Sequence, residues 1–254
     1  MTGRLTVVGL GPGNHGSITP EAAGALAAAA AVYGYEAYLD RVPVRAGQAR
    51  HPSNNREEQA RAAAALRHAA AGTNVAVVSG GDPGVFAMAA AICAAIEQGP
   101  AAWRDLDVAI IPGVTAMLAV AARVGAPLGH DFCALSLSDN LKPWEMITQR
   151  LEAAARAGFV IAIYNPVSQA RPWQLRAAFD RVAKLLPETT PVIFGRAIGR
   201  ADEGVEVTTL AAAKSAAADM ATLVIIGSAE TRVIGRQGRA PLVYTPRAAA
   251  RAQR

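Results

Sequence analysis

The chain has 254 residues, of which 52% are hydrophobic and 5% aromatic, and a formal net charge of +5. This length and apolar content suffice for one large or two modest domains, whereas so few aromatic residues argue against a surface that stacks nucleic-acid bases. The apolar segments are shorter than the roughly 18 residues of a bilayer span, so we expect no membrane segment.

The same sequence predicts a cytoplasmic protein without a resident metal. Its N-terminal residues lack the charged start and apolar stretch of a secretory signal. Cys93 and Cys133 lie in apolar contexts and outside any ligand spacing with the histidines, so we expect buried, reduced thiols and no metal site. The positive charge suits a small anionic substrate, although it says little about the fold.

The first apolar run, residues 5–9, leads into the glycine loop Gly9-Leu10-Gly11-Pro12-Gly13. A dinucleotide fingerprint would have glycine where this chain has Asn14, and Pro12 removes an amide that a phosphate cradle would use. We expect the following helix to begin after Thr19 as N-cap, with Pro20 at its first position. A phosphate site in this loop is therefore disfavoured.

A second glycine loop, Ser79-Gly80-Gly81-Asp82-Pro83-Gly84-Val85-Phe86, follows the apolar run at 75–78. Its three glycines let the backbone approach a ligand closely, because no Cβ stands in the way. A tight turn in which Asp82 caps the next helix explains the same residues equally well. Strands are also predicted at 32–35 and 108–112, the second of them ending in the turn Pro112-Gly113-Val114.

The alternation of strands and helices continues in the second half. Strands are predicted at 132–137, 159–164, 192–196, 205–209 and 223–227, and helices from the Pro112-Gly113 turn to 124 and over 144–157. Such alternation predicts an α/β fold with parallel sheet covered on both faces and ligands at the carboxyl ends of the strands. We divide the chain into domains 1–113 and 114–246, followed by a basic tail, 247–254, that we expect to be disordered.

Four motifs stand in order along the chain: Gly9-Leu10-Gly11-Pro12-Gly13, Gly80-Gly81-Asp82-Pro83-Gly84, Pro112-Gly113-Val114-Thr115-Ala116, and Tyr164-Asn165-Pro166 with Gly195-Arg196. Each is common alone, but the ordered set resembles the tetrapyrrole methyltransferases, which use S-adenosylmethionine. The resemblance covers nearly the whole chain. It implies two consecutive αβα domains with the cofactor in the cleft between them, and a homodimer.

The same resemblance implies a set of cofactor-binding positions. They are Pro12, Gly80, Gly81, Asp82, Val85, Thr115, Ala116, Asn165, Gly195 and Ala197. Backbone groups and a carboxylate are suited to the ribose, amino and carboxylate parts of the cofactor. Helix initiation also explains Thr115 and Ala116, and a strand-ending turn also explains Asn165.

Stretches at 34–39, 130–132 and 136–144 resemble the branch of the family that methylates carbon 17 of a precorrin and contracts the ring. That substrate carries many carboxylates on its rim. Arginines could receive them in bidentate fashion. Candidates are Arg41, Arg45, Arg50, Arg171 and Arg196, of which Arg196 lies in a family motif and is the predicted substrate-binding residue.

Methyl transfer to an electron-rich ring carbon depends mainly on positioning, so no protein nucleophile is expected. A base is still useful, because protons are relocated as the ring rearranges. Candidates are Asp139, His130, Asp131 and Tyr35. A polar turn explains His130 and Asp131 as well, and a helix cap explains Asp139. Related siroheme-pathway enzymes carry a proposed aspartate base where this chain has Gly34, so that role is not transferred.

Three functions are therefore considered. The first is methylation of carbon 17 with ring contraction, and the second is methylation of another ring carbon or of a cobalt-bearing substrate by a sister enzyme. The fold does not separate these two. The third is a nucleotide- or NAD-binding domain, against which Pro12 and Asn14 argue.

Overall fold

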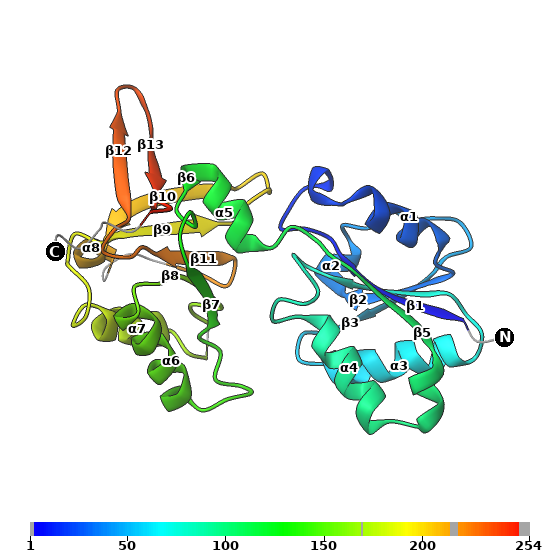
Figure 1. The fold of residues 1–254 in the computed structure, drawn as a ribbon. Coiled ribbons are helices and arrows are strands. Elements are labelled where there is room, and N and C mark those ends of the chain that lie inside the picture. Colours follow the sequence, from blue (N-terminus) through cyan, green and yellow to red (C-terminus); the bar gives the residue numbers. More distant parts are fainter. Residues whose placement is uncertain (1–2, 169, 214–217, 249–254) are drawn as a thin grey trace. The chain divides into compact units, whose positions relative to one another are not determined.

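The computed structural model describes residues 3–168, 170–213 and 218–248. The chain divides into two compact units, Met1–Ala116 and Met117–Arg254. Figure 1 shows that each unit has a β-sheet with helices on both of its faces. Most of the tail that we expected to be disordered, residues 249–254, lies outside the described residues.

The first unit contains a five-stranded parallel sheet in the order β3-β2-β4-β1-β5. Its elements are β1 (Arg4–Gly9), η1 (His15–Ser17), α1 (Pro20–Ala28), β2 (Ala31–Tyr35), α2 (Glu36–Leu39), β3 (Ala49–Ser53), α3 (Glu58–Ala70), β4 (Val75–Ser79), α4 (Met88–Gln98), η2 (Ala101–Asp105) and β5 (Asp107–Ile111). The four strands predicted from apolar runs are confirmed. The sequence did not predict β3, because this edge strand is partly exposed and has no apolar run.

Side chains of the central strands alternate between two apolar layers. Val7 and Val77 belong to the layer that includes α3 and α4, whereas Val8 and Val78 belong to the layer that includes α1. Burial on both faces explains why these strands appear in the sequence as continuous apolar runs. The predicted start of α1 is confirmed, since Thr19 Oγ1 accepts a hydrogen bond from the amide of Ala22 at 3.1 Å.

A histidine–tyrosine cluster lies on one face of this sheet. The His51 ring stacks on Tyr33 with centroids 4.2 Å apart, and the Tyr33 hydroxyl is 3.1 Å from His68 Nδ1. His51 Nε2 is buried without a hydrogen-bond partner among the described residues. Burial, and secondly the nearby His68, hold the pKa of His51 below its ordinary 6.5.

Stability is expected to fall on acidification in part because of His51. The His51 imidazole binds a proton near pH 6.5 in the unfolded chain but only at lower pH in the folded chain. Its contribution to the free energy of unfolding is therefore complete above pH 6.5 and declines below it. His51→Phe keeps the stacking but does not titrate. Urea midpoints measured from about pH 7.5 to pH 5 should then fall less steeply than in the wild type. The exposed control His15→Gln should keep the wild-type slope, and a wild-type slope in His51→Phe would contradict this assignment.

The second unit contains a mixed five-stranded sheet in the order β10-β9-β11-β8-β7. Its elements are α5 (Ala116–Val124), β7 (Phe132–Ser136), α6 (Trp144–Arg156), β8 (Val160–Tyr164), α7 (Gln174–Val182), β9 (Pro191–Arg196), β10 (Gly204–Thr209), α8 (Leu210–Ala213) and β11 (Thr222–Ile226). The predicted strands are confirmed, but the expectation of parallel sheet is wrong here. Only β7 and β8 pair in parallel, while β11 is antiparallel to β8 and β9, and β10 to β9. The short 197–203 connection permits a hairpin but not a helical crossover.

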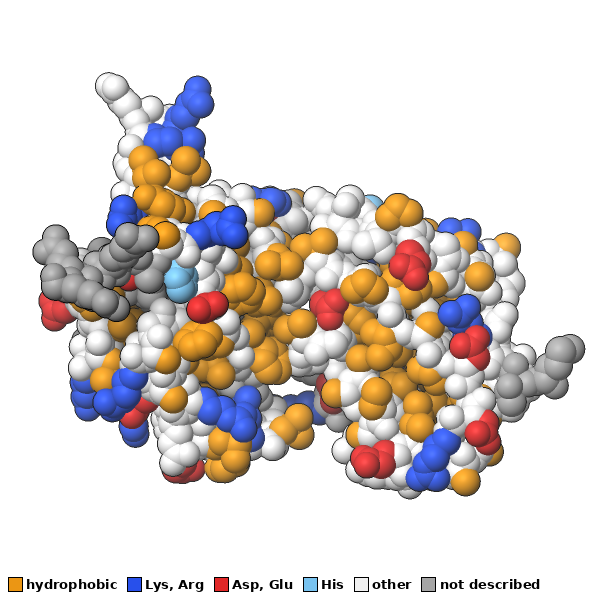
Figure 2. Space-filling view, in the orientation of Figure 1, with side chains coloured by type: hydrophobic (Ala, Val, Ile, Leu, Met, Phe, Trp, Pro, Cys, Tyr) orange, Lys and Arg blue, Asp and Glu red, His pale blue; other side chains and the backbone are white. Residues whose placement is uncertain are grey.

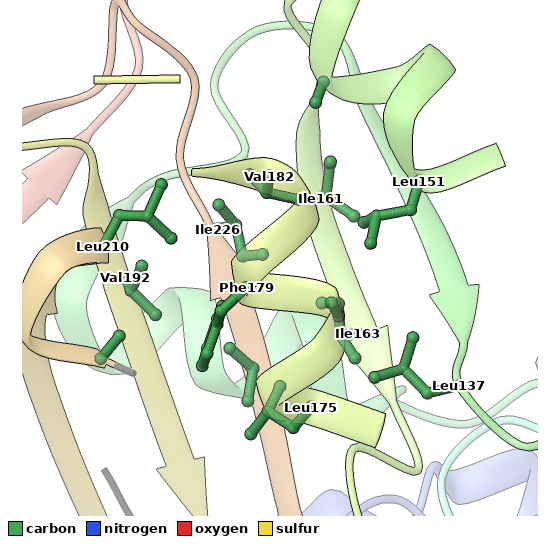
Figure 3. Close-up of a cluster of buried hydrophobic side chains, with 14 of the residues drawn as sticks. Leu137, Leu151, Ile161, Ile163, Leu175, Phe179, Val182, Val192, Leu210 and Ile226 are labelled. Carbon is green, nitrogen blue, oxygen red and sulfur yellow. The ribbon is translucent and has the colours of Figure 1, made fainter. Parts of the chain in front are cut away.

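Helices α6 and α7 cover one face of this sheet. Figure 3 shows Leu151 and Phe179 of these helices against Ile161 and Ile163 of β8, all of them 0–1% exposed. The opposite face contacts α5 at Gly195, where an added Cβ would lie 2.3 Å from Cγ2 of Val120. The central strands β8, β9 and β11 are therefore buried along most of their length, whereas β10 at the margin is exposed or half-buried.

A small third sheet joins β12 (Arg232–Arg236), β13 (Arg239–Tyr244) and β6 (Gly125–Ala126) in the order β12-β13-β6. Its β12–β13 hairpin projects from the unit, and Figure 2 shows apolar side chains toward its base and basic side chains toward its tip. The sequence did not predict this hairpin, because β12 is exposed along its whole length and has no buried face.

Two further expectations concern burial. Cys93 is exposed, so the prediction that it is buried is wrong, whereas Cys133 is half-buried and burial raises the pKa of its thiol. Both thiols are free.

In the part of the chain that the structure describes, no helix has the length and apolar character needed to cross a bilayer.

Candidate functional site

Three loops meet at the carboxyl ends of the parallel strands in the first unit. Gly11, after β1, and Gly81, after β4, exchange backbone hydrogen bonds of 3.1 and 2.9 Å. The amide of Leu10 also donates to the carbonyl of Ser79 at 2.9 Å. The two glycine loops that stand far apart in the sequence are thus directly joined.

The turn after β5 packs so closely on these loops that two positions exclude any side chain. A Cβ on Gly113 would lie 2.3 Å from the carbonyl oxygen of Gly81, and a Cβ on Gly9 would lie 2.6 Å from the amide nitrogen of Gly113. Gly11 and Gly81 each have φ of +67°, a conformation that glycine adopts without a steric penalty. Contact between the loops therefore accounts for Gly9 and Gly113, and the positive φ accounts for Gly11 and Gly81.

Asp82 ties the loop after β4 to the turn after β5. Its Oδ1 accepts a hydrogen bond from the amide of Gly84 at 2.8 Å, and its Oδ2 accepts one from Gly113 at 3.1 Å. The alternative that Asp82 caps the next helix is wrong, because the N-cap of α4 is Ala87 and that cap has no side-chain hydrogen bond.

Arg41 stabilises the first loop through hydrogen bonds to its backbone. Its Nη2 donates to the carbonyls of Leu10 and Gly11 at 2.7 and 2.9 Å. Arg50 donates in the same way to the carbonyls of Leu39 and Val42. Both arginines are among the predicted candidates for substrate carboxylates. The positioning role of Arg41 was not predicted, because its acceptors lie about 30 residues away in the chain.

Five backbone amides of these loops already donate hydrogen bonds within the first unit. The amides of Leu10, Gly11, Gly81, Gly84 and Gly113 all donate within the unit, and Pro12 has none. A pyrophosphate is bound chiefly by backbone amides that are free to point at it. A carbonyl oxygen has two lone pairs, so the oxygens of Leu10 and Gly81, which accept from Arg41 and Gly11, can each accept a second hydrogen bond from a hydroxyl, amino or cationic group.

Other predicted positions of the first unit lie around the same edge. Pro12 and Val85 are partly exposed in the two loops, Thr115 is 5% exposed just before α5, and Ala116 is the first residue of that helix. Phe86, which was not predicted, is 50% exposed and has φ of +53°. Such a dihedral is uncommon for a bulky residue and marks a local strain that sequence patterns do not reveal.

In the second unit, the strained residues Asn165 and Ala197 lie at one edge of the sheet. They follow β8 and β9, which run in the same direction because both are antiparallel to β11. Each has φ of +50°, which asparagine tolerates better than alanine. Asn165 Nδ2 donates to Ser136 Oγ at 2.9 Å, and the amide of Ala197 donates to the carbonyl of Ala221 at 3.0 Å. Gly195 is needed for the close contact with α5, whether or not it meets a ligand.

The candidate bases are not gathered at one place. Asp139 follows β7, at the same sheet edge as Asn165, and forms an ion pair with Arg171. His130 and Asp131 precede β7 and so lie at the opposite end of that strand, where His130 Nδ1 accepts the Asp131 amide at 2.8 Å. Tyr35 ends β2 in the first unit and contacts Tyr38 edge-on. Their catalytic roles stay predictions.

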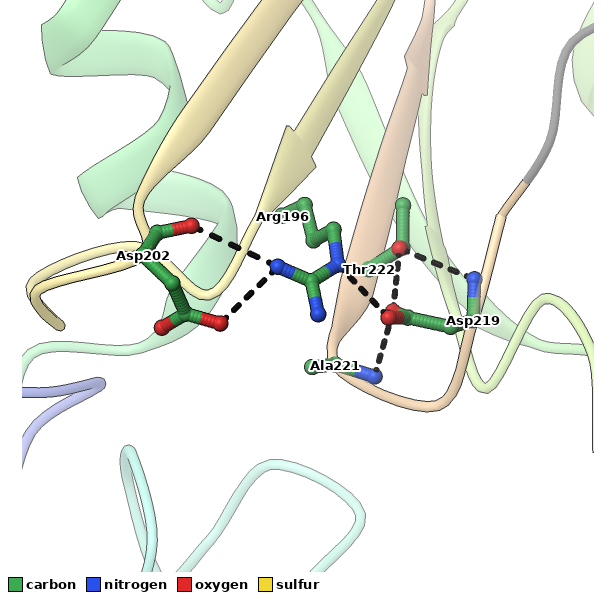
Figure 4. Close-up of polar contacts among 5 residues, drawn as sticks. All are labelled: Arg196, Asp202, Asp219, Ala221 and Thr222. Carbon is green, nitrogen blue, oxygen red and sulfur yellow. Dashed lines mark hydrogen bonds and ion pairs between the residues drawn. The ribbon is translucent and has the colours of Figure 1, made fainter.

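Arg196 is held by two carboxylates. Its Nε donates to Asp219 at 2.7 Å and its Nη1 donates to Asp202 at 2.9 Å, as Figure 4 shows. The hydrogen bond from Arg196 lowers the pKa of Asp202. Asp219 also accepts hydrogen bonds from Ala221 and Thr222, so the arginine anchors the start of β11. Its contact with substrate stays a prediction.

Comparison with known proteins places these features in context. The family model "Tetrapyrrole (Corrin/Porphyrin) Methylases" matches residues 4–214. The chain is 64% identical to a precorrin-3B C(17)-methyltransferase of Sinorhizobium sp, over 97% of both chains. It is 40% identical to a probable cobalt-factor III C(17)-methyltransferase of Salmonella typhimurium, over 96% of this chain and 98% of the relative. The crystal structure of the methyltransferase CobJ matches with a TM-score of 0.90 at 46% identity, covering 96% of this chain and 100% of that one.

Proposed function

The chain belongs to the tetrapyrrole (corrin/porphyrin) methylase family, and from this premise we propose that it methylates carbon 17 of precorrin-3B, with ring contraction to precorrin-4, in cobalamin biosynthesis. The methyl donor in this proposal is S-adenosylmethionine, which leaves as S-adenosylhomocysteine. The observation that carries the proposal is the 64% identity, over 97% of both chains, to a relative named for that reaction.

The loops of the first unit suit this cofactor better than a dinucleotide. S-adenosylmethionine has hydroxyl, amino, carboxylate and sulfonium groups but no phosphate, and five amides of these loops already donate internally, which leaves fewer donors for a pyrophosphate. When bound, it supplies an electrophilic methyl group. The residues that would hold it are Pro12, Gly80, Gly81, Asp82, Val85, Thr115 and Ala116 in the first unit, and Asn165, Gly195 and Ala197 in the second.

The chain's own contribution to the chemistry is positioning. Arg41 and Asp82 hold the loops of the first unit in one arrangement, so a ligand there meets oxygens that need little reorganisation. Among the candidate bases, Asp139 shares its sheet edge with Asn165 and Ala197, which makes it the first to test for moving a proton.

The reaction is tested by incubating the protein with precorrin-3B and S-adenosylmethionine labelled with carbon-13 in the methyl group, and locating the label by NMR. We expect it on carbon 17 of a ring-contracted product. Label on another carbon would overturn the regiochemistry. A parallel incubation with cobalt-factor III addresses the second candidate, which the 40% identical Salmonella relative motivates.

Cofactor choice is tested separately by calorimetry. S-adenosylhomocysteine should bind and NADH should not, because Pro12 has no amide and five amides of these loops already donate within the unit. Comparable binding of both would return the nucleotide-binding alternative to consideration. We also propose a homodimer, which sedimentation equilibrium can check.

A further inference from the structure

After β8, Ser168 pairs with Arg171 in an isolated antiparallel bridge. The amide of Ser168 donates to the carbonyl of Arg171 at 3.3 Å, and the amide of Arg171 donates back at 2.9 Å. Residues paired directly in an antiparallel bridge project their side chains to the same face. The Ser168 hydroxyl and the Arg171 guanidinium therefore leave the bridge on one side.

Among the described residues, the guanidinium of Arg171 is held through its Nη1. Nη1 donates to Asp139 and, at 2.6 Å, to Asn140 Oδ1. Arg171 Nε and Ser168 Oγ are both buried without a hydrogen-bond partner in the described part of the chain. A buried donor left unsatisfied costs free energy, so two of them on one face of a bridge require an explanation.

The position of the bridge agrees with a ligand-binding role. It follows β8, at the edge of the sheet that also carries Asn165 and Ala197. The mainly apolar pocket beside it is lined by Val167, Ser168, Pro172, Ala218, Asp219, Met220 and Ala221. An apolar pocket with hydrogen-bond donors at its margin suits a flat hydrophobic ring that bears an acidic side chain.

We propose that Arg171 and Ser168 form a subsite for one carboxylate on the rim of the tetrapyrrole. The inference rests on the proposed function, which supplies a substrate with such carboxylates. The carboxylate would accept from the Nε–Nη2 edge of the guanidinium in the side-by-side geometry that arginine favours, and from the serine hydroxyl. Asp139 and Asn140 then act as positioning residues that orient the guanidinium through Nη1.

Arg171 is better suited to this role than Arg196. Arg196 faces the carboxylates of Asp202 and Asp219, which leaves that group with one excess negative charge. Arg171 faces one carboxylate and one neutral amide, so its group is balanced. A further anion at Arg171 therefore meets no excess negative charge within that ion-pair group, and Asp219, which lines the adjacent pocket, is paired with Arg196.

The test is a titration with precorrin-3B in which tryptophan fluorescence reports binding. S-adenosylhomocysteine is present, because it cannot donate a methyl group. Trp173 is 46% exposed and stands two positions from Arg171, so it reports binding there. Arg171→Met should raise the dissociation constant about tenfold to hundredfold, and Arg171→Lys by less, as expected for loss of a charge-assisted pair. Ser168→Ala should raise it about threefold to tenfold. The matched control Arg176→Met, at an exposed position of α7, should bind as the wild type does.

A second variant separates binding from structural support. Asp139→Asn breaks the ion pair but keeps the guanidinium, so its affinity for precorrin-3B should fall clearly less than that of Arg171→Met. Equal losses in the two variants, or wild-type affinity in Arg171→Met, would overturn the subsite. Affinity for S-adenosylhomocysteine should be unchanged in every variant. If the wild type binds neither compound, the proposed function itself fails, which is a different result from a failed subsite.

Discussion

Gly113→Ala is expected to destabilise the first unit by about 3 kcal/mol or more and to abolish measurable cofactor binding. The added Cβ would lie 2.3 Å from the carbonyl oxygen of Gly81 and 2.9 Å from the Cα of Gly9. Both neighbours are backbone atoms in loops that are hydrogen-bonded to each other. Moving the Gly81 carbonyl aside would disturb the hydrogen bond that it accepts from the amide of Gly11.

Gly24→Ala is the matched control for this change. Gly24 lies within α1 and an added Cβ would have no atom within 4 Å, so alanine there should stabilise the protein by about 0.5–1 kcal/mol. Scanning calorimetry should follow both variants, because it can resolve the transitions of two units. If Gly113→Ala melted like Gly24→Ala, the close packing of the three loops would be refuted.

Asp82→Ala should lower the affinity for S-adenosylhomocysteine about tenfold to hundredfold while the protein stays folded. The change removes the acceptors of two backbone amides, Gly84 and Gly113, and hydrogen bonds to a charged group contribute about 1.5–3 kcal/mol each. The turn after β5 then loses its link to the loop after β4, and both loops carry proposed cofactor contacts. Calorimetric titration measures the affinity, and thermal unfolding measures the stability.

Two controls limit the interpretation of Asp82→Ala. Asp40→Ala removes an exposed carboxylate from the same unit and should leave both affinity and stability near the wild type. Asp82→Asn keeps one acceptor oxygen for one of the two amides, so its affinity should lie between those of the wild type and the alanine variant. A loss of stability with unchanged affinity would give Asp82 a purely structural role.

The predictions from sequence are confirmed where a structural element depends on neighbouring residues or on a regular pattern of apolar residues. Apolar runs located β1, β4, β8 and β11, because a strand buried on both faces needs apolar residues at successive positions. Thr19 and Pro20 located the start of α1, since a helix cap acts over a few residues. The edge strand β3 and the β12–β13 hairpin were missed because exposed strands do not need that pattern.

The sequence by itself determined the family, which the ordered glycine motifs indicated and the comparisons confirmed, and the approximate bounds of the buried strands. The tertiary structure alone decided which partners meet: Asp82 with Gly113, 31 positions away, and Arg171 with Asp139, 32 positions away. It also placed His130 at the far end of β7 from Asp139 and made the second sheet mixed. The reason is physical: propensity and periodicity act within one element, whereas strand order and direction determine which distant loops share an edge.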